Sequence, residues 1–504
     1  MPWTPHRPLP ARRRATLLPL LALVLLQACA PVFARSRPAG AAALRATLDS
    51  VFADTALTQA HWGVLVRSLD DGEVIYRQNA EKLFVPASNM KLVTGAAALQ
   101  ALGPAYRYRT RVLAAGPVRD GALRGDLIVV GSGDPTLSVR FGGDARAVFR
   151  AWADSLRARG IRRVTGNLVG IDSVFDDVPL GRGWAWDDLD AAYSAEISGL
   201  QFNEGAIAVR VYAGRAVGDA GVVVLDPPTA YVPVVNQTRT VAAGRAGWLD
   251  ATREPQGAGL RLRGEVPLGS DALNERFATR NPTAYFVGVL RETLREAGVA
   301  VEGAAIDADE WPERATSAAG AAPLFTHASP PLAEILPAYL KPSQNQIAET
   351  LLRTLGRELR GEGSSRAGAA AEDSVLRAGG LPTARRLVIA DGSGLSRYNL
   401  VSPAFLADLL TRMAQGPHAQ LWQAALPVAG VDGTLASRLR GTPAERNVHA
   451  KTGTLSSVRA LSGYLTTAAG ERLVFSMLAN HHARAAADVD RVVDAALARL
   501  AEWR

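Results

Sequence analysis

The strand patterns at the two ends of this chain constrain its fold more than any other feature. Residues 61–79, HWGVLVRSLDDGEVIYRQN, predict two strands that meet at an Asp-Gly turn. Residues 448–465 and 471–480 alternate like strands, and residues 485–500 repeat apolar side chains at helical spacing. Because such a helix buries its apolar face against a sheet, we expect the two ends to build one domain.

The tract between these ends has strand and helix signals of its own. At 504 residues the chain is longer than one hydrophobic core usually supports. The middle of the tract is rich in Val, Gly and Pro and lacks long helical periods. We therefore predict a multidomain α/β protein with three parts: a domain of residues 35–105 and 324–504, an inserted domain of residues 106–202 and 270–323, and a nested β-rich domain of residues 203–269.

Residues 1–34 predict an export signal. Arginines precede an apolar run from Leu17 to Leu26, which is too short to span a bilayer, and residues 32–34 resemble a signal-peptidase site. The chain's only cysteine, Cys29, excludes an internal disulfide and resembles a lipoprotein cleavage site. Two outcomes stay open, membrane attachment through a lipidated Cys29 or cleavage after Ala34. Both predict a periplasmic or cell-envelope protein.

The charge balance does not favour nucleic-acid binding. The signal contains four arginines and no acidic residue, so its removal lowers the formal charge from +8 to +4. An excess this small on a chain of this length gives no basic surface of the kind that binds nucleic acid.

Lysine is scarce, and three of the four lysines lie in or beside short motifs. Ser88 and Lys91 are three residues apart in a predicted helix, so they share one face. Taken alone, the pair also fits a helix cap with a lysine that reaches water. The same ambiguity applies to Ser343 and Asn345, which follow Lys341 and precede an apolar helix. The third motif, Lys451-Thr452-Gly453, lies on a predicted strand and is followed by Thr454.

Ser-x-x-Lys, Ser-x-Asn and Lys-Thr-Gly in this order are typical of penicillin-binding proteins and serine β-lactamases. With the large insertion and the stretches GSGDPTL, YSAEISGLQFNEGAI and DGSGLSRYNLVSP, the chain resembles the class C low-molecular-mass penicillin-binding proteins. That resemblance implies a D-alanyl-D-alanine carboxypeptidase and D,D-endopeptidase with a split transpeptidase-like α/β domain. The implied partners are peptidoglycan stem peptides and β-lactam antibiotics, which acylate such enzymes.

The chemistry of the motifs agrees with that activity. Ser88 needs a base, and only an unprotonated Lys91 can accept its proton, since an arginine does not deprotonate in proteins. We expect burial and a second cation, Lys451, to lower the pKa of Lys91. Lys451, Thr452 and Thr454 are then expected to hold the substrate carboxylate. By resemblance, Ser343 relays the proton to the leaving amine and Asn345 holds the substrate amide. The resemblance also implies an oxyanion hole made of two backbone N–H groups, one from Ser88 and one from Thr454.

Other interpretations stay open at this point. A serine β-lactamase shares all three motifs, although it does not need a long insertion, and a non-catalytic wall-binding scaffold would use the inserted domains alone. By resemblance, the acidic candidates for contacting the amino end of a diaminopimelate side chain are Asp172, Asp176 and Asp177, although surface solvation is the more common role for any single one of them. The sequence indicates no cofactor and no metal, because His481 and His482 are adjacent and point apart. It does not indicate an oligomeric state.

Overall fold

The computed structural model describes residues 40–254, 257–311 and 318–504. The predicted export signal at residues 1–34, with Cys29, lies outside the described residues. Within the three described ranges, no helix combines the length and the apolar character that a membrane span requires.

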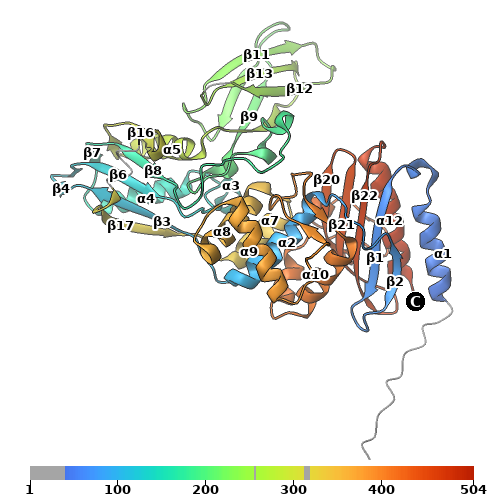
Figure 1. Ribbon diagram of the computed structural model, residues 1–504. Coiled ribbons are helices and arrows are strands. Elements are labelled where there is room, and N and C mark those ends of the chain that lie inside the picture. The colour runs from blue at the N-terminus through green and yellow to red at the C-terminus, as the bar shows by residue number, and fades with distance from the viewer. Residues whose placement is uncertain (1–39, 255–256, 312–317) are drawn as a thin grey trace, which may run out of the picture. The chain divides into compact units, whose positions relative to one another are not determined.

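Five antiparallel strands from the two ends of the chain form one sheet (Figure 1). Their order is β2-β1-β22-β21-β20. Their bounds are β1 (His61–Ser68), β2 (Val74–Gln78), β20 (His449–Leu455), β21 (Val458–Thr466) and β22 (Arg472–Asn480). The predicted hairpin is confirmed, since β1 pairs with β2 across a turn that contains Gly72 at φ +79°. Along its full length β1 also pairs with β22, so the two chain ends share this sheet.

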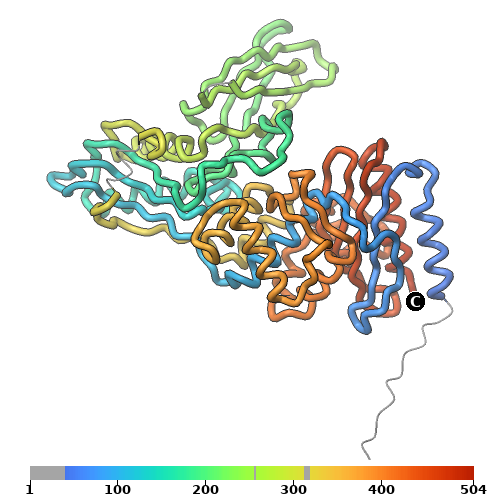
Figure 2. The backbone as a smooth tube through the Cα atoms, viewed as in Figure 1, coloured from blue at the N-terminus to red at the C-terminus, as the bar shows by residue number. Residues whose placement is uncertain are grey.

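Strand β22 shows why both faces of the sheet are covered by helices. Its alternate side chains enter two different apolar clusters, because successive residues of a strand point to opposite faces. Phe475 and Met477 pack in the cluster that contains α1 (Gly40–Phe52) and α12 (Ala486–Glu502). Figure 2 shows these two helices side by side, in blue and red. The predicted helix at residues 485–500 is therefore confirmed.

Val474 and Leu478 of the same strand pack on the other face, in a larger cluster that several helices share. These helices are α2 (Met90–Leu102), α7 (Leu332–Leu340), α8 (Asn345–Arg360), α9 (Ser365–Ala378), α10 (Pro403–Gln415) and α11 (Ala419–Ala425). The short elements of this region are η1 (Thr55–Leu57), η2 (Ala87–Asn89), β18 (Leu387–Val388), β19 (Leu400–Val401) and η8 (Gly433–Leu435). The helical layer supplies two of the three predicted motifs, and β20 supplies the third.

The tract between the two ends has its own sheets and its own core. A five-stranded sheet has the order β16-β8-β6-β3-β17, and a smaller one has the order β15-β7-β5-β4. The strands are β3 (Arg109–Ala115), β4 (Val118–Arg119), β5 (Ala122–Leu123), β6 (Asp126–Val130), β7 (Arg163–Val164), β8 (Leu168–Ile171), β15 (Ala300–Val301), β16 (Ala305–Asp307) and β17 (Ala322–Ala328). The helices are α3 (Val139–Gly142), α4 (Ala147–Ala158) and α5 (Pro282–Glu296). Phe149 of α4 and Phe286 of α5 meet in its core.

Two further three-stranded sheets, ordered β10-β9-β14 and β11-β13-β12, enclose a separate apolar cluster. Their strands are β9 (Ala206–Tyr212), β10 (Val222–Asp226), β11 (Val234–Val241), β12 (Trp248–Arg253), β13 (Leu260–Pro267) and β14 (Leu273–Ala278). The single-turn helices nearby are η3 (Trp186–Asp188), η4 (Ala192–Ser194), η5 (Asn203–Gly205) and η6 (Ala308–Glu310). The domain limits given above stay a prediction, and β14 pairs with β9 although it lies beyond residue 269.

Candidate active site

The three predicted motifs meet beside strand β20. Ser88 lies in the turn η2, directly before α2, and Asn345 is the first residue of α8. The Asn89 side-chain amide donates a hydrogen bond of 2.9 Å to the Lys451 carbonyl on β20. That bond ties the turn that holds Ser88 to the strand that carries Lys451.

Gly453 lets the strand approach this turn closely. A β-carbon at this position would lie 2.6 Å from the Pro86 carbonyl oxygen and 3.1 Å from the Ser88 backbone nitrogen. Both distances are below van der Waals contact, so any other residue would push β20 away from the turn. The close approach of β20 to the Ser88 turn therefore explains why the third motif contains a glycine, which the sequence did not reveal.

Lys91 is fully buried, and its amine has three oxygen neighbours. Its Nζ lies 3.0 Å from Ser88 Oγ, 2.6 Å from Asn345 Oδ1 and 2.7 Å from the Ser393 carbonyl oxygen. A neutral amine has two N–H donors and one lone pair. Asn345 Oδ1 and the Ser393 carbonyl can only accept, so they take the two donors. The lone pair is then left for the hydroxyl proton of Ser88.

Burial lowers the pKa of Lys91 to about 7, although the carboxylates of Asp391 and Glu349 act in the opposite direction. Of the two predicted causes, burial is the main one, and Lys451 is not among the groups that shift the pKa of Lys91 most. The amine can therefore exist in its neutral form near pH 7 and accept a proton from Ser88.

Lys451 is also fully buried, and its Nζ donates a hydrogen bond of 2.9 Å to the Thr452 carbonyl. Burial lowers its pKa well below the ordinary value, and the charge of Lys91 acts in the same direction. The two amines thus disfavour each other's charge, as two cations in a low dielectric must. Its ammonium lies behind the wall of the cleft, whereas Thr452 and Thr454 line it.

The residues of the middle motif are available for chemistry because another side chain caps the helix. Gln344 accepts a hydrogen bond of 2.9 Å from the Ile347 backbone N–H and so caps α8. Ser343 lies in the turn before it with φ +65°, and its side chain lines the cleft together with that of Asn345. Neither residue is used as a helix cap, which was the alternative reading of this motif.

The cleft in front of Ser88 has a volume of about 580 Å³ and is lined by residues from distant parts of the chain. The motif residues that line it are Ser88, Ser343, Asn345, Thr452 and Thr454. The remaining lining residues are Gly183, Ala185, Asp187, Asp188, Tyr193, Gly394, Leu395, Arg397, Thr434, Leu455 and Ser456. The segment 183–193 of the inserted tract therefore forms part of the site, which the sequence analysis missed.

Two hydrogen bonds attach this inserted segment to the motifs. The Asn345 side-chain amide donates to the Tyr193 carbonyl over 2.7 Å, and Trp184 Nε1 donates to Asp391 Oδ2 over 2.9 Å. Trp186 between them is 85% exposed. The available signal in the sequence was the run GWAWDDLD, which combines aromatic and acidic residues outside any strand or helix pattern.

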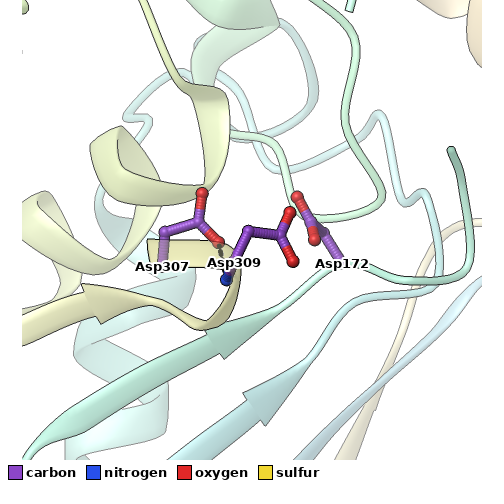
Figure 3. Close-up of side chains that lie close together, drawn as sticks. All are labelled: Asp172, Asp307 and Asp309. Atoms are coloured by element: carbon purple, nitrogen blue, oxygen red, sulfur yellow. Dashed lines mark hydrogen bonds between the residues drawn. The ribbon is translucent and has the colours of Figure 1, made fainter. Parts of the chain in front are cut away.

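The three acidic candidates from the sequence lie elsewhere. Asp172 approaches Asp307 and Asp309, with carboxylate oxygens of the three residues within 4.8 Å of one another (Figure 3). Asp176 pairs with Arg353 at 2.8 Å. Neither of them, nor Asp177, is among the described residues that line the cleft. The acidic residues of the insertion that do line the cleft are Asp187 and Asp188.

The carboxylates shown in Figure 3 shift the pKa of one of their own number, Asp309. Burial and the neighbouring carboxylates, first of all that of Asp172, raise the pKa of Asp309 to about 6. Oxygen donors of this kind suit hard cations such as Mg²⁺ or Ca²⁺. Three carboxylates alone do not define a metal site, and no other feature of the described residues around them points to a cation.

Two further residues lie near the motifs, Lys341 and His449. Lys341 Nζ lies 2.6 Å from Asp432 Oδ2, and its carbonyl accepts the Thr434 N–H over 3.0 Å. Lys341 thereby fixes Thr434, whose hydroxyl accepts a hydrogen bond from Thr452 over 2.7 Å. The pKa of His449 is lowered by burial, which favours its neutral form.

Comparison with known proteins gives a consistent result. The sequence profile described as the D-Ala-D-Ala carboxypeptidase 3 (S13) family matches residues 44–500. A D-alanyl-D-alanine carboxypeptidase from an Actinomadura species is 38% identical over 511 residues, which cover 98% of this chain and 91% of that protein. The D-alanyl-D-alanine carboxypeptidase DacB of Haemophilus influenzae is 29% identical over 428 residues, 83% of this chain and 85% of DacB.

The fold agrees with these sequence matches. The crystal structure of penicillin binding protein 4 (dacB) from Haemophilus influenzae superimposes with a TM-score of 0.79 at 26% identity, over 90% of this chain and 99% of that one. A second crystal structure of that protein, complexed with a β-lactam, gives a TM-score of 0.71 at 24% identity, over 90% and 97% of the two chains. The predicted multidomain α/β fold of the penicillin-binding type is therefore confirmed.

Proposed function

This chain belongs to the D-Ala-D-Ala carboxypeptidase 3 (S13) family, and on that basis we propose that Ser88 is its nucleophile. The enzyme is a serine-type D-alanyl-D-alanine carboxypeptidase that removes the terminal D-alanine from peptidoglycan stem peptides. The observation that carries the assignment is the amine of Lys91, which lies 3.0 Å from Ser88 Oγ and is held by Asn345 Oδ1.

Acylation begins when the neutral Lys91 amine takes the proton of Ser88. Ser88 Oγ then bonds to the carbonyl carbon of the penultimate D-alanine, and the negative charge moves to the carbonyl oxygen. Backbone N–H groups of Ser88 and Thr454 would stabilise this oxyanion, an arrangement typically worth about 3 to 4 kcal/mol per donor. A dry, preformed site favours this step because the donors do not need to reorganise.

Collapse of this intermediate breaks the peptide C–N bond. The leaving amine of the terminal D-alanine takes a proton, which Ser343 relays from the protonated Lys91. The product is an ester on Ser88 and a free D-alanine. Water then attacks the ester carbonyl, the shortened peptide leaves as a carboxylate, and Ser88 recovers its proton.

The free carboxylate of the substrate is held at the β20 side of the cleft. Thr452 and Thr454 line the cleft there, and the amine of Lys451, buried behind them, would stabilise a carboxylate at that side in its protonated form, which the carboxylate in turn favours. The Arg459 guanidinium donates to Thr454 Oγ1 and is itself paired with Asp490, so that hydroxyl is oriented. Asn345 would turn its amide from the Tyr193 carbonyl to the substrate amide when the substrate enters.

The inserted segment recognises the side chain of the stem peptide. Asp187 and Asp188 line the cleft as part of the inserted segment 183–193, and their carboxylates suit a cationic amino group such as the free end of a diaminopimelate side chain. This role replaces the one that the sequence suggested for Asp172, Asp176 and Asp177. Cleavage of D,D cross-links uses the same acyl transfer with a longer leaving amine.

β-Lactams should acylate Ser88, because their strained amide presents a carbonyl and a carboxylate in the same relation as the terminal D-alanine. The first experiment is intact-mass analysis after incubation with benzylpenicillin. We expect a single adduct that maps to Ser88 and is absent in Ser88→Ala. A wild-type protein without any adduct would contradict the proposal and would favour a non-catalytic scaffold.

The lifetime of that adduct separates a peptidase from a β-lactamase. We expect a stable penicilloyl enzyme and release of D-alanine from a peptide that ends in D-Ala-D-Ala. Hydrolysis of benzylpenicillin at many turnovers per second, without D-alanine release, would identify a β-lactamase instead.

We also propose that the protein acts in the cell envelope, in line with its substrate and with the export signal expected at residues 1–34. Lipid attachment through Cys29 has a direct test. If Cys29 is lipidated, Cys29→Ser should move the protein from the membrane fraction to the soluble fraction. Unchanged fractionation would contradict lipidation and leave cleavage after Ala34.

A further inference from the structure

The segment DGSGLS, residues 391–396, packs directly against the proposed nucleophile. Gly394 has φ +85°, and a β-carbon there would lie 1.8 Å from the Ala87 carbonyl oxygen. The carbonyl of Ser393 accepts a hydrogen bond from Lys91 Nζ over 2.7 Å. The conformation of this segment therefore decides where one of the three neighbours of the Lys91 amine lies.

Glu349 holds that segment from behind. It lies four residues after Asn345 on α8, so the two side chains share one face of the helix. Its carboxylate accepts the backbone N–H groups of Ser393 at 2.7 Å and Gly392 at 3.1 Å. Its side chain is buried, at 1% exposure, so water does not replace these bonds.

We propose that Glu349 is a positioning residue for Lys91: through the Gly392–Ser393 backbone it holds the amine of Lys91 against Ser88, and its carboxylate interacts electrostatically with that amine. This inference rests on the roles proposed above for Ser88 and Lys91. Glu349 does not line the cleft and need not touch the substrate.

The charges around this pair come from four elements. Asp391 belongs to the held segment and accepts hydrogen bonds from the backbone N–H groups of Gly394 and Ser396. The other neighbours are Glu372 of α9, Arg353 of α8 and Lys451 of β20. Burial raises the pKa of Glu349 to about 7, and the charge of Asp391 acts in the same direction. Glu349 and Lys91 therefore exchange protons with solvent over the same pH range, and their titrations are linked.

The sign of the linkage follows from charge alone. An ionised Glu349 favours the protonated amine of Lys91, so removing the negative charge lowers the pKa of Lys91. The glutamine of Glu349→Gln keeps the size of the side chain and one acceptor oxygen for the Ser393 N–H. In this variant more of Lys91 is neutral near pH 7, where Glu349 of the wild type is partly ionised.

Glu372 offers a matched control. It is equally buried, and its carboxylate accepts only the Thr94 hydroxyl among the described hydrogen bonds, over 3.3 Å. Burial raises its pKa well above the ordinary value, and the carboxylates that act on the pKa of Lys91 are those of Asp391 and Glu349. Glu372→Gln therefore changes a carboxyl at a similar depth that neither holds the Gly392–Ser393 backbone nor acts on the pKa of Lys91.

The test measures the second-order rate of Ser88 acylation by a fluorescent penicillin from pH 5 to 9. For Glu349→Gln we expect the midpoint of the acid limb to move to lower pH by about 0.5 to 1 unit, with a plateau that falls no more than about tenfold. Glu372→Gln should keep the wild-type midpoint. Glu349→Asp, which retains the charge but shortens the side chain, should slow the plateau and also keep the wild-type midpoint.

The outcomes separate this inference from the proposed function. If the wild type forms no adduct at Ser88, the proposed function and this inference both fail. If the wild type is acylated but the midpoint of Glu349→Gln equals that of the wild type, only the role of Glu349 is wrong. The same holds if the midpoint of Glu372→Gln shifts as far as that of Glu349→Gln. If circular dichroism shows that Glu349→Gln does not fold, Glu349→Asp decides. A midpoint that differs from that of the wild type would overturn the inference. An unchanged midpoint with a slower plateau would support it.

Discussion

The two walls of the cleft differ in burial. The motif wall carries Ser88 and Asn345, with the fully buried amines of Lys91 and Lys451 behind it. The insertion wall is formed by Asp187, Asp188 and Tyr193, which are exposed or half-buried. A charge in a dry environment interacts strongly with its neighbours, whereas water and salt screen an exposed one.

This difference separates chemistry from recognition. Burial sets the protonation of Lys91, so a small change behind the motif wall alters the step in which bonds form. The insertion wall has no buried charge among its cleft-lining residues and is suited to contributing binding energy alone. We therefore expect large effects on acylation from the motif wall and small, substrate-dependent effects from the insertion wall.

Replacing Lys91 should have the largest effect. Lys91→Arg keeps the positive charge, but a guanidinium cannot accept the proton of Ser88. We expect acylation by fluorescent penicillin to fall by roughly a thousandfold or more, the size typical of a lost general base. Circular dichroism serves as the control for folding. Labelling at the wild-type rate would show that Lys91 is not the base.

Acid pH should have the next largest effect. The pKa of Lys91 is lowered to about 7, so the neutral amine predominates above that pH and the protonated amine below it. Two units below the pKa only about 1% of the amine is neutral, which predicts acylation about a hundredfold slower at pH 5 than at pH 9. A stopped-flow pH profile of the wild type measures this, with thermal melting at each pH as the control. A flat profile between pH 5 and 8 would contradict the buried-base mechanism.

Lys451→Arg should slow acylation by about 10- to 100-fold, less than Lys91→Arg. The variant keeps a cation behind Thr452, but its planar group does not fit the site of a compact ammonium. The order of the two rates is the decisive measurement, made under the same conditions with melting temperatures for both proteins. Equal rates would mean that the two amines do not have separate roles.

Asp188→Asn should have the smallest effect, and only on recognition. A partly exposed carboxylate contributes about 1 kcal/mol or less to binding a cationic group. We expect KM to rise about two- to fivefold for a peptide with a free side-chain amine, with kcat nearly unchanged. A peptide with an acetylated amine is the control and should show no change. Slower labelling by benzylpenicillin would mean that the insertion wall also acts in the chemical step.

The part of this site that could be predicted depends on local geometry. Ser88 and Lys91 are three residues apart, and the pitch of a helical turn brings Oγ and Nζ to 3.0 Å. The turn at Gly72 and the alternation in β22 likewise follow from neighbours in the chain. Helix pitch and strand alternation are the same in every protein, so such contacts can be inferred without a structure.

The part that could not be predicted depends on contacts between distant segments. Tyr193 meets Asn345 across 152 residues, and Trp184 meets Asp391 across 207. Asp172, Asp176 and Asp177 were candidates by resemblance, with surface solvation as the other interpretation, and they do not line the cleft. Composition does not reveal which acidic residues of an insertion return to the site. The cause of the shifted pKa of Lys91 was only partly foreseen for the same reason.

The sequence by itself determined which residue types this site contains, their chain order, and the helix and strand that carry Ser88, Lys91 and Lys451. Only the tertiary structure decided that Lys91 is dry, that Glu349 lies behind it, and that the insertion supplies a wall of the cleft. The physical reason is that motif spacing acts through the covalent chain, whereas burial and electrostatic fields arise from everything packed around a group. A lysine becomes a base through its surroundings, and those surroundings exist only after folding.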